Sequence, residues 1–352
     1  MINKKIQIYS VRLAFYFLLC AFLSSFYTRC NAQALSSFSS QKNSQKTSQY
    51  TPHVWPESAV RILVGFPAGS TPDMIARSLS DPLSRALGQP VIIENRVGVA
   101  GNLAAQMVAK AQDDHTLGLL INGNLTTAKL LYPTLGFDPL QDFAPLSIIA
   151  TSPMVLVAPN NLPSGKAFFQ AAQDGSNKWN YGSVGMGSMA HLGMEALKKI
   201  LPGLNPVHVP YSGNPAVLGA LMSEEIQMAL VPVGVAMPLV NSGKIQAIAI
   251  TSGKSVLAPN VPSLASLGVK GDGVDLVVWD ALVGPKNLSK QAVDRLSKEI
   301  SLLSHNNELR NQLLNQGWRL VASDQEGALQ LIKPEYSLMS KLIVQLNVRI
   351  EP

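Results

Sequence analysis

Four loops of this chain combine glycine with hydroxyl or amide side chains and lead into segments with a helical pattern. They span residues 67–73, 121–127, 182–188 and 210–215. Glycine lets a ligand approach backbone N–H groups closely, and Ser, Thr and Asn side chains add directed hydrogen bonds. The first turn of a helix also leaves N–H groups without partners at the positive end of the helix dipole. Two such loops facing each other across a cleft could hold both ends of an organic diacid without Arg or Lys.

The first loop follows an apolar run over residues 60–66 that is typical of a strand. Thr71 is the expected N-cap of the next helix, Pro72 suits the first helical position, and Asp73 suits the positive end of the dipole. We therefore expect the backbone N–H groups from Ala68 to Thr71 to bind a carboxylate. The alternative is an ordinary turn between a strand and a helix.

Other kinds of site lack their sequence signatures. Residues 182–187 have the spacing Gly-x-x-Gly-x-Gly, which differs from the Gly-x-Gly-x-x-Gly of dinucleotide loops. The histidines are scattered without metal-ligand spacing, and the tryptophans are too dispersed for a stacking platform. The chain contains no Gly-x-Ser-x-Gly elbow and no His-Glu-x-x-His motif. We therefore expect no catalytic residue, no bound metal and no cofactor.

The N-terminus has the pattern of an export signal. Lys4, Lys5 and Arg12 precede an uncharged apolar run over residues 13–28, and Ala-Gln-Ala follows at 32–34. The run is shorter than the roughly 20 residues that span a bilayer, although an uncleaved membrane anchor is the alternative. We expect a cleavable signal peptide over residues 1–34, export to the periplasm, and a disordered tether over residues 35–54.

This N-terminal segment also holds both cysteines and the excess of positive charge. Cys20 and Cys30 precede the expected cleavage point, so the mature protein would contain neither a disulfide nor a thiolate site. Six of the 28 Lys and Arg residues, but no Asp or Glu, lie before residue 51, which leaves 22 basic against 22 acidic residues. The folded part is formally neutral, so we expect no nucleic-acid partner. Any anion must be bound by local geometry.

Strand and helix patterns alternate over the rest of the chain. The expected strands span residues 60–66, 91–94, 116–121, 154–158, 207–209, 227–231, 247–251 and 276–283, and the expected helices 74–87, 103–111, 190–200, 216–222, 290–304 and 307–316. This alternation predicts parallel βαβ units in a doubly wound α/β sheet, where ligands bind beside helix N-termini. Pro82 lies inside the first helix, and the apolar spacing across it favours one bent helix.

Residues 55–102 resemble the start of the periplasmic substrate-binding receptors of tripartite tricarboxylate transporters, the Bug-type family. The segment at 87–96 reads LGQPVIIENR, which is nearly identical to the family pattern. The resemblance continues to the C-terminus through segments 137–145, 180–183, 207–211, 242–247, 261–263 and 313–320. No single motif is decisive, but their order and spacing together are specific.

The resemblance implies an α/β, periplasmic-binding-protein-like fold with two doubly wound lobes joined by two crossing strands. Lobe one would comprise residues 55–153 plus 277–352 and lobe two residues 154–276, with the crossing strands near 148–155 and 276–283. It also implies a monomeric receptor that captures a small organic carboxylic acid in an interlobe cleft. The receptor would deliver this acid to inner-membrane transporter subunits.

The loops and the resemblance together predict the ligand-binding residues. These are Phe66, Ala68, Gly69, Ser70, Thr71, Asp73, Asn122, Gly123, Asn124, Ser183, Gly187, Ser188, His191, Tyr211, Gly213 and Val231. The chain departs from the family pattern at Pro72, which takes the place of a Thr, and at Val231, where the family commonly has Asp. These departures favour a more apolar pocket, and hence a monocarboxylate, an aromatic acid or a longer diacid over a tricarboxylate.

Competing functions remain open from the sequence. A receptor of this kind could present its ligand to a periplasmic sensor instead of a carrier. An exported hydrolase or transferase on the same architecture is a second alternative, although the usual nucleophile motifs are missing. A ligand-responsive transcription regulator is disfavoured by the export signal, the neutral charge and the lack of a helix-turn-helix before Trp55.

Overall fold

The computed structural model describes residues 55–174, 178–251, 253 and 255–349. The predicted signal peptide, its cleavage point and the tether lie outside these residues. The strands of the described part form one sheet in the order β2-β1-β3-β9-β4-β7-β5-β6, and β8 and β10 also pair with β4. Their bounds are β1 Val60–Val64, β2 Val91–Asn95, β3 Thr116–Ile121, β4 Phe143–Ala158, β5 Asn180–Ser183, β6 Val207–Pro210, β7 Met228–Pro232, β8 Gln246–Ile250, β9 Val277–Pro285 and β10 Arg319–Leu320.

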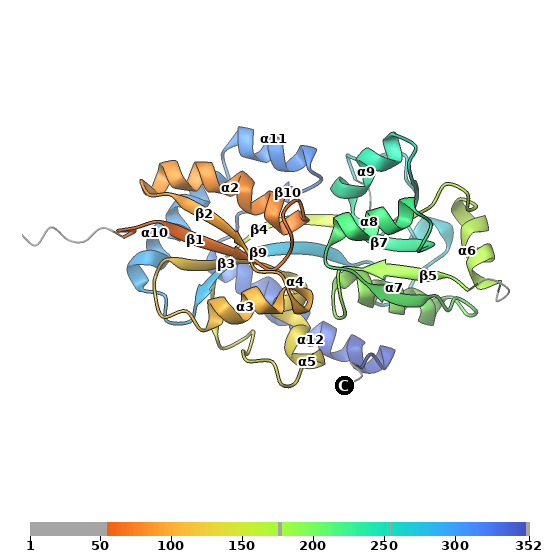
Figure 1. Ribbon diagram of the computed structural model, residues 1–352, viewed down its shortest axis with the longest axis horizontal. Helices are drawn as coiled ribbons and strands as arrows, with labels where there is room; N and C mark the ends of the chain where they lie inside the picture. Colours follow the sequence, from red (N-terminus) through yellow and green to blue (C-terminus); the bar gives the residue numbers. More distant parts are fainter. Residues whose placement is uncertain (1–54, 175–177, 252, 254, 350–352) are drawn as a thin grey trace, which may run out of the picture. The chain divides into compact units, whose positions relative to one another are not determined.

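The predicted parallel units occur at both ends of the sheet, but its centre is antiparallel. β1 pairs in parallel with β2 and β3, and β5 pairs in parallel with β6 and β7. β4 and β9 run antiparallel to each other and to their other neighbours. The two long strands β4 and β9 extend from one group of shorter strands into the other (Figure 1). We call the group with β1, β2 and β3 lobe one and the group with β5 to β8 lobe two.

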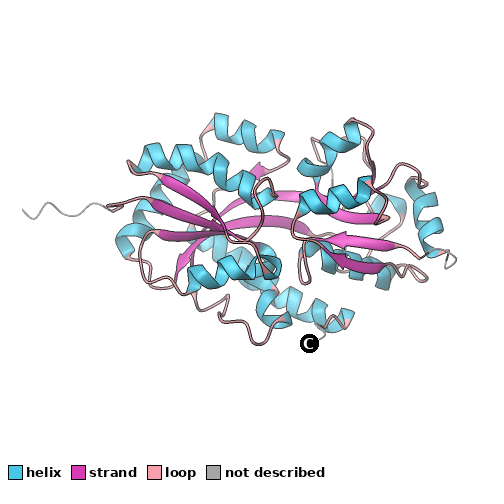
Figure 2. Ribbon diagram, in the orientation of Figure 1, coloured by secondary structure: helices cyan, strands magenta, loops and turns pink. Residues whose placement is uncertain are grey.

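Helices cover both faces of the sheet in each lobe (Figure 2). The α-helices are α2 Thr71–Leu87, α3 Asn102–Ala109, α4 Asn122–Thr126, α5 Ala128–Leu131, α6 Gly165–Gln173, α7 Met189–Ile200, α8 Asn214–Met222, α9 Val233–Asn241, α10 Lys290–Leu303, α11 Asn307–Asn315 and α12 Gln325–Leu346. In the described part of the chain, none of the helices is long and apolar enough to cross a membrane.

Alternating strand residues give each lobe two cores. In β1, Ile62 and Val64 pack with α2, α10 and α11, whereas Leu63 packs on the opposite face with α3 and α12. In lobe two, Leu230 of β7 packs with α6 and α7, and its neighbour Val231 packs with α8 and α9. This alternation follows from the two-residue period of a strand.

The first helix corrects one prediction and confirms another. The helix α2 begins at Thr71, so its N-cap is Ser70 and not Thr71. It continues through Pro82 to Leu87 as a single helix, as the apolar spacing predicted. Ile75, Leu79 and Leu83 are buried on its inner face, and this burial keeps the helix continuous across the proline.

Candidate functional site

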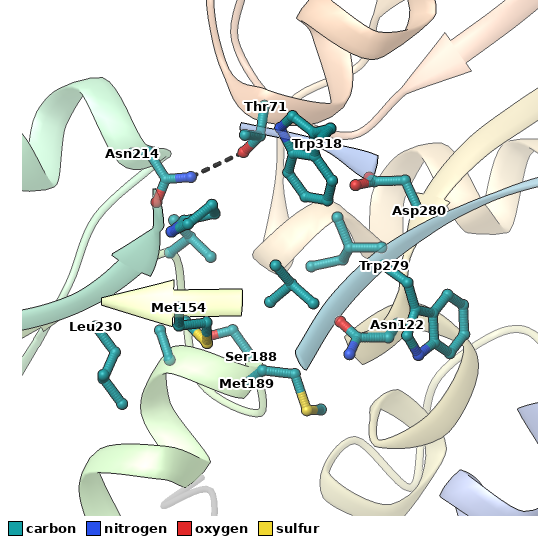
Figure 3. A pocket seen from close by; sticks show the side chains of 15 residues that line it. Thr71, Asn122, Met154, Ser188, Met189, Asn214, Leu230, Trp279, Asp280 and Trp318 are labelled. Carbon is teal, nitrogen blue, oxygen red and sulfur yellow. Dashed lines mark hydrogen bonds between the residues drawn. The ribbon is translucent and has the colours of Figure 1, made fainter. Parts of the chain in front are cut away.

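A cavity lies between the lobes, beside the crossing strands β4 and β9 (Figure 3). The space between its side chains amounts to about 400 Å³, including open solvent at its mouth. It is lined by Thr71, Ile121, Asn122, Met154, Val184, Ser188, Met189, Ala190, Asn214, Leu230, Pro232, Val278, Trp279, Asp280 and Trp318.

Four helices begin at this cavity, two from each lobe. Thr71 and Asn122 are the first residues of α2 and α4 in lobe one. Met189 and Asn214 are the first residues of α7 and α8 in lobe two, and Ser188 is the N-cap of α7. Helix N-termini carry partial positive charge and N–H groups without intrahelical partners. The cavity is therefore suited to a carboxylate, although its lining includes neither Lys nor Arg.

Two hydrogen bonds join the lobes beside the cavity. Asn214 Nδ2 donates to Thr71 Oγ1 at 2.8 Å, and Thr127 Oγ1 donates to the Gly187 carbonyl oxygen at 2.6 Å. Because Thr71 Oγ1 accepts from Asn214, its own hydroxyl hydrogen is available to a ligand. The same contact that joins the lobes thus leaves a donor in the cavity.

The amide of Asn122 is oriented by partners behind the cavity. Its Nδ2 donates to the Val277 carbonyl oxygen at 3.2 Å and to Glu335 Oε1 at 3.1 Å. Trp279 Nε1 donates to the other oxygen of Glu335 at 2.6 Å. Burial raises the pKa of Glu335 to about 7, against the lowering effect of these two hydrogen bonds. Because Nδ2 is engaged, Asn122 offers Oδ1 to the cavity as an acceptor.

Two polar side chains of the lining are buried without partners. The carboxyl of Asp280 in β9 is only 1% exposed, and its Oδ1 has no hydrogen-bond partner among the described residues. Burial raises the pKa of Asp280 to about 8. Trp318 Nε1, also buried, likewise has no partner in the described part of the chain. Buried polar groups are normally hydrogen-bonded, so these two groups leave hydrogen-bonding capacity beside the cavity.

Eight of the predicted residues line hollows at the interface of the lobes. Thr71, Asn122 and Ser188 line the cavity itself. Gly123, Asn124 and Gly187 line an adjoining hollow of about 210 Å³ together with Ser188. Phe66 and Tyr211 line a third and wider hollow of about 820 Å³, with residues 97–101 on one side and 184–186 on the other. That hollow, too, has a wall from each lobe.

Two backbone N–H groups of the first loop form bonds within the loop, so the predicted carboxylate contact remains a prediction for Ala68 and Thr71. Gly69 N–H donates to Asp73 Oδ2 at 2.8 Å, and Ser70 N–H donates to the Pro67 carbonyl oxygen at 3.1 Å. Ala68 and Gly69 are exposed, and Ser70 Oγ is buried without a partner among the described residues. Of this loop, only Thr71 lines the cavity.

Asp73 stabilises the loop instead of facing the cavity. It accepts hydrogen bonds from Gly69 N–H, from the Arg77 guanidinium and from Asn95 Nδ2. Burial raises the pKa of this carboxyl, but these hydrogen bonds and the charge of Arg77 outweigh burial and hold the pKa below its usual value. Its contacts are those of a buried structural carboxylate.

The remaining predicted residues lie behind the cavity. His191 Nδ1 accepts from Gly187 N–H at 3.2 Å, and Ser183 Oγ lies 2.7 Å from His208 Nε2. Gly213, just before α8, lies against the first loop, where an added Cβ would come within 3.4 Å of Pro67 Cδ. Val231 packs into the core under α8 and α9 and does not line the cavity, so its contact with a ligand remains a prediction. The cavity-facing residues of β7 are its neighbours, Leu230 and Pro232.

The cavity is also lined by residues that were not selected from the sequence, among them Asn214, Trp279, Asp280 and Trp318. Asn214 lies inside a predicted loop, but only Tyr211 and Gly213 of that loop were selected. Asp280 is a lone acid within the apolar run 276–283, and that isolation was the available signal. The expectation of a more apolar pocket is therefore corrected at this position, where the lining carries a carboxyl.

Comparison with known proteins places these features in context. Residues 75–348 match the family model described as "Tripartite tricarboxylate transporter family receptor". A UPF0065 protein of Bordetella pertussis is 35% identical over 237 residues, which cover 66% of this chain and 72% of that protein.

In the described part of the chain, none of the His, Cys, Asp and Glu side chains form a group of three that could hold a metal ion.

Solved structures are similar over most of the chain. Periplasmic binding protein BugD matches at a TM-score of 0.78 and 27% identity, over 84% of this chain and 100% of that one. R. palustris Rpa4515 with adipate matches at a TM-score of 0.79 and 27% identity, over 84% of this chain and 99% of that one. MatC (Rpa3494) from Rhodopseudomonas palustris with bound malate matches at a TM-score of 0.76 and 27% identity, over 82% of this chain and 100% of that one. These likenesses confirm the expected fold class, whereas the predicted lobe boundaries remain a prediction.

Proposed function

Because the chain belongs to the tripartite tricarboxylate transporter receptor family, we propose that it is a Bug-type solute receptor that captures a small carboxylic acid between its lobes. The observation that carries this proposal is the start of four helices, two from each lobe, at one cavity without Lys or Arg. Their N-termini and the free hydroxyl hydrogen of Thr71 supply donors to a carboxylate.

Two similar structures carry organic diacids, one with adipate and one with malate. For this chain we propose an acid small enough for the cavity between β4, β9 and the helix starts. Ile121, Met154 and Leu230 give the cavity an apolar wall that would contact the carbon skeleton. The ligand would thus be held by donors at its carboxylate and by apolar contact along its chain.

We further propose that the receptor is a monomer, acts in the periplasm and delivers its ligand to an inner-membrane transporter. The family description and the similar periplasmic binding protein support this location and this class of partner. N-terminal sequencing of periplasmic protein should begin near Leu35. An intact Met1 in the membrane fraction would contradict export with cleavage.

Binding without turnover distinguishes a receptor from an exported hydrolase. Native mass spectrometry of freshly purified periplasmic protein should reveal a bound acid, which should be recovered chemically unchanged. Added acid should raise the melting temperature, because it binds the folded state. Conversion of the acid in proportion to protein concentration would favour the enzyme alternative.

A matched pair of variants tests the site itself. Thr71→Val removes the cavity hydroxyl and should lower affinity by about 10-fold, as expected for a lost hydrogen bond to a carboxylate. Thr134→Val makes the same change at an exposed turn outside the cavity and should leave affinity unchanged. Equal affinity of both variants for the acid would remove this cavity from the binding site.

A further inference from the structure

Among the described residues that line the cavity, Asp280 has the only ionisable side chain. The register of the sheet places it opposite Ile121 of β3 and Ala150 of β4. Its carboxyl points toward Trp318 (Figure 3), and its Oδ1 is buried without a hydrogen-bond partner among the described residues. An ionised carboxyl in such a place needs a cation or several donors, whereas a protonated carboxyl needs only an acceptor for its hydrogen.

The elements packed against β9 supply no charge to Asp280. In the part of the chain that the structure describes, β3, β4, α3 and α4 pack against β9 and contain no ionisable side chain. Glu335 of α12 is bonded to Trp279, which packs on the opposite face of β9. Arg319 of β10 is exposed. Burial therefore raises the pKa of Asp280 to about 8 without a charge that opposes it.

The helices on the same face as Asp280 have no cation to spare for it. Leu282, two residues further along β9 on this face, packs with α2, α10 and α11. The buried carboxyls of these helices lie 3.0 and 3.4 Å from an arginine of the same helix, in the pairs Asp73–Arg77 and Glu299–Arg295. The remaining charged side chains of the three helices are exposed. The surroundings of Asp280 thus favour its protonated form.

A protonated Asp280 would add a donor to those that already face the cavity. The Thr71 hydroxyl hydrogen is free because Oγ1 accepts from Asn214, and the buried Nε1 of Trp318 has no partner among the described residues. The helix starts at Met189 and Asn214 add partial positive charge from lobe two. A carboxylate has two oxygens and can accept several such bonds, so one ligand group satisfies several of these donors.

We propose that Asp280 captures the ligand carboxylate as a protonated hydrogen-bond donor, so that capture of the acid is coupled to one proton on Asp280. This inference rests on the proposed function, since it concerns the same cavity and the same carboxylate. Two carboxylates in contact cannot both be ionised without a cation, and the lining includes neither Lys nor Arg. The bound acid therefore raises the pKa of Asp280 further. Where the free protein has lost this proton, binding takes one up from the solvent.

The pH dependence of affinity tests this role by titration calorimetry. The probes are succinate, glutarate and adipate, which are ionised at both pH values used. Because the pKa of Asp280 in the free protein is about 8, the affinity of the wild-type protein should fall about 10-fold between pH 7 and pH 9. Binding at pH 9 should take up about one proton, seen as a dependence of the binding enthalpy on the buffer, and binding at pH 7 almost none.

Two substitutions of Asp280 separate its proton from its role as a donor. Asp280→Asn keeps an N–H donor that does not titrate, so its affinity should be equal at pH 7 and pH 9 and should exceed that of the wild type at pH 9. Asp280→Leu has a similar branched shape without a donor, and it should bind about 10-fold more weakly than the wild type at pH 7. Asp272→Asn, an exposed change outside the cavity, should keep the wild-type pH dependence.

Other titrating groups near the cavity can be told apart from Asp280. Burial lowers the pKa values of His191 and His208 to about 4, so both stay neutral between pH 7 and pH 9. Glu335 has a pKa of about 7 but lies behind Asn122, so Glu335→Gln should retain the fall in affinity. Proton uptake by the wild-type protein needs no substitution, and it tests the proposal even if the Asp280 variants fail to fold.

The outcomes separate the two claims. If the acids bind equally at both pH values without proton uptake, the inference is wrong and the receptor function stands. If the affinity of Asp280→Asn falls with pH as that of the wild type does, another group carries the proton and the inference is again wrong. If no small carboxylic acid binds at either pH, the proposed function is wrong and this inference falls with it.

Discussion

The side chain of Asn214, at the start of α8, donates a 2.8 Å hydrogen bond to the hydroxyl of Thr71, at the start of α2. Both residues are buried, and they belong to different lobes. The bond joins the first residues of two helices, and both residues line the cavity. A ligand bound in this cavity would contact both lobes, so we expect lobe contact and ligand binding to be coupled.

The first prediction concerns this bond. Thr71→Val and Asn214→Leu should each weaken ligand binding, and the double variant should lose less than the two losses added together. The coupling energy should be about 1 kcal/mol, typical of one buried hydrogen bond. Titration calorimetry of the four proteins measures it. Strictly additive losses would show that the bond does not form in the ligand-bound state.

The second prediction concerns the first loop, which Asp73 holds through Gly69, Arg77 and Asn95. Asp73→Ala leaves these donors without their acceptor and should lower the free energy of unfolding by about 1.5–3 kcal/mol at pH 7. Asp81→Ala removes an exposed carboxylate from the same helix and should change little.

The pH dependence of this loss has a definite sign. Hydrogen bonds lower the pKa of Asp73 in the folded state, so its contribution is present above the ordinary Asp pKa and is lost as pH falls through the folded value. Thermal melts from pH 7 down to pH 3 should therefore bring wild type and Asp73→Ala closer together. A constant gap over this range would contradict the assigned role of the ionised carboxylate.

The sequence pattern predicted well those helices whose apolar residues pack into a single core. The helices α7 and α10 agree with prediction within one residue, because each packs its apolar residues into a single core. The long helix α12 was missed. Its first half packs Ala328 and Ile332 into the core of lobe one, and its second half packs Met339 and Leu342 into that of lobe two. A helix that serves two cores shows no continuous apolar stripe.

Only those residues of the cavity lining that have a local sequence signature could be selected from the sequence. Loops before helices have a local signature, and Thr71, Asn122 and Ser188, which line the cavity, were selected in this way. Asp280 and Trp318 come from a crossing strand and from the turn after α11, and only the tertiary fold brings them to the same cavity. In the first loop, Asp73 already occupies Gly69 N–H, so this donor is not available to a ligand.

The third prediction concerns Glu335, which orients Asn122 from behind the cavity. Burial raises its pKa to about 7, above the usual value of a carboxyl. A raised carboxyl pKa contributes stability at low pH, and this contribution is lost as pH rises through the folded value. Glu335→Gln should therefore gain stability relative to wild type between pH 5 and pH 8, by a few degrees in melting temperature. A parallel pH dependence of the two proteins would contradict the buried environment of this side chain.

The last prediction concerns Gly187, whose carbonyl accepts the bond from Thr127 across the lobes. Its φ is +82°, and an added Cβ would lie 2.6 Å from Leu131 Cδ1 and 3.2 Å from Thr127 Oγ1, both in lobe one. Gly187→Ala should therefore hold the lobes apart and weaken ligand binding by roughly 10-fold or more. Gly243→Ala is the matched control, because Gly243 also has a positive φ, +68°, but faces open space.

Both variants carry a similar backbone penalty of about 1 kcal/mol, so their difference reports the contact between the lobes. Small-angle X-ray scattering with saturating ligand should give a larger radius of gyration for Gly187→Ala than for Gly243→Ala. Calorimetry should show the loss of affinity only in Gly187→Ala. If the two variants have the same affinity and the same radius of gyration, Leu131 and Thr127 can move aside. The approach of Gly187 to lobe one then does not limit closure around the ligand.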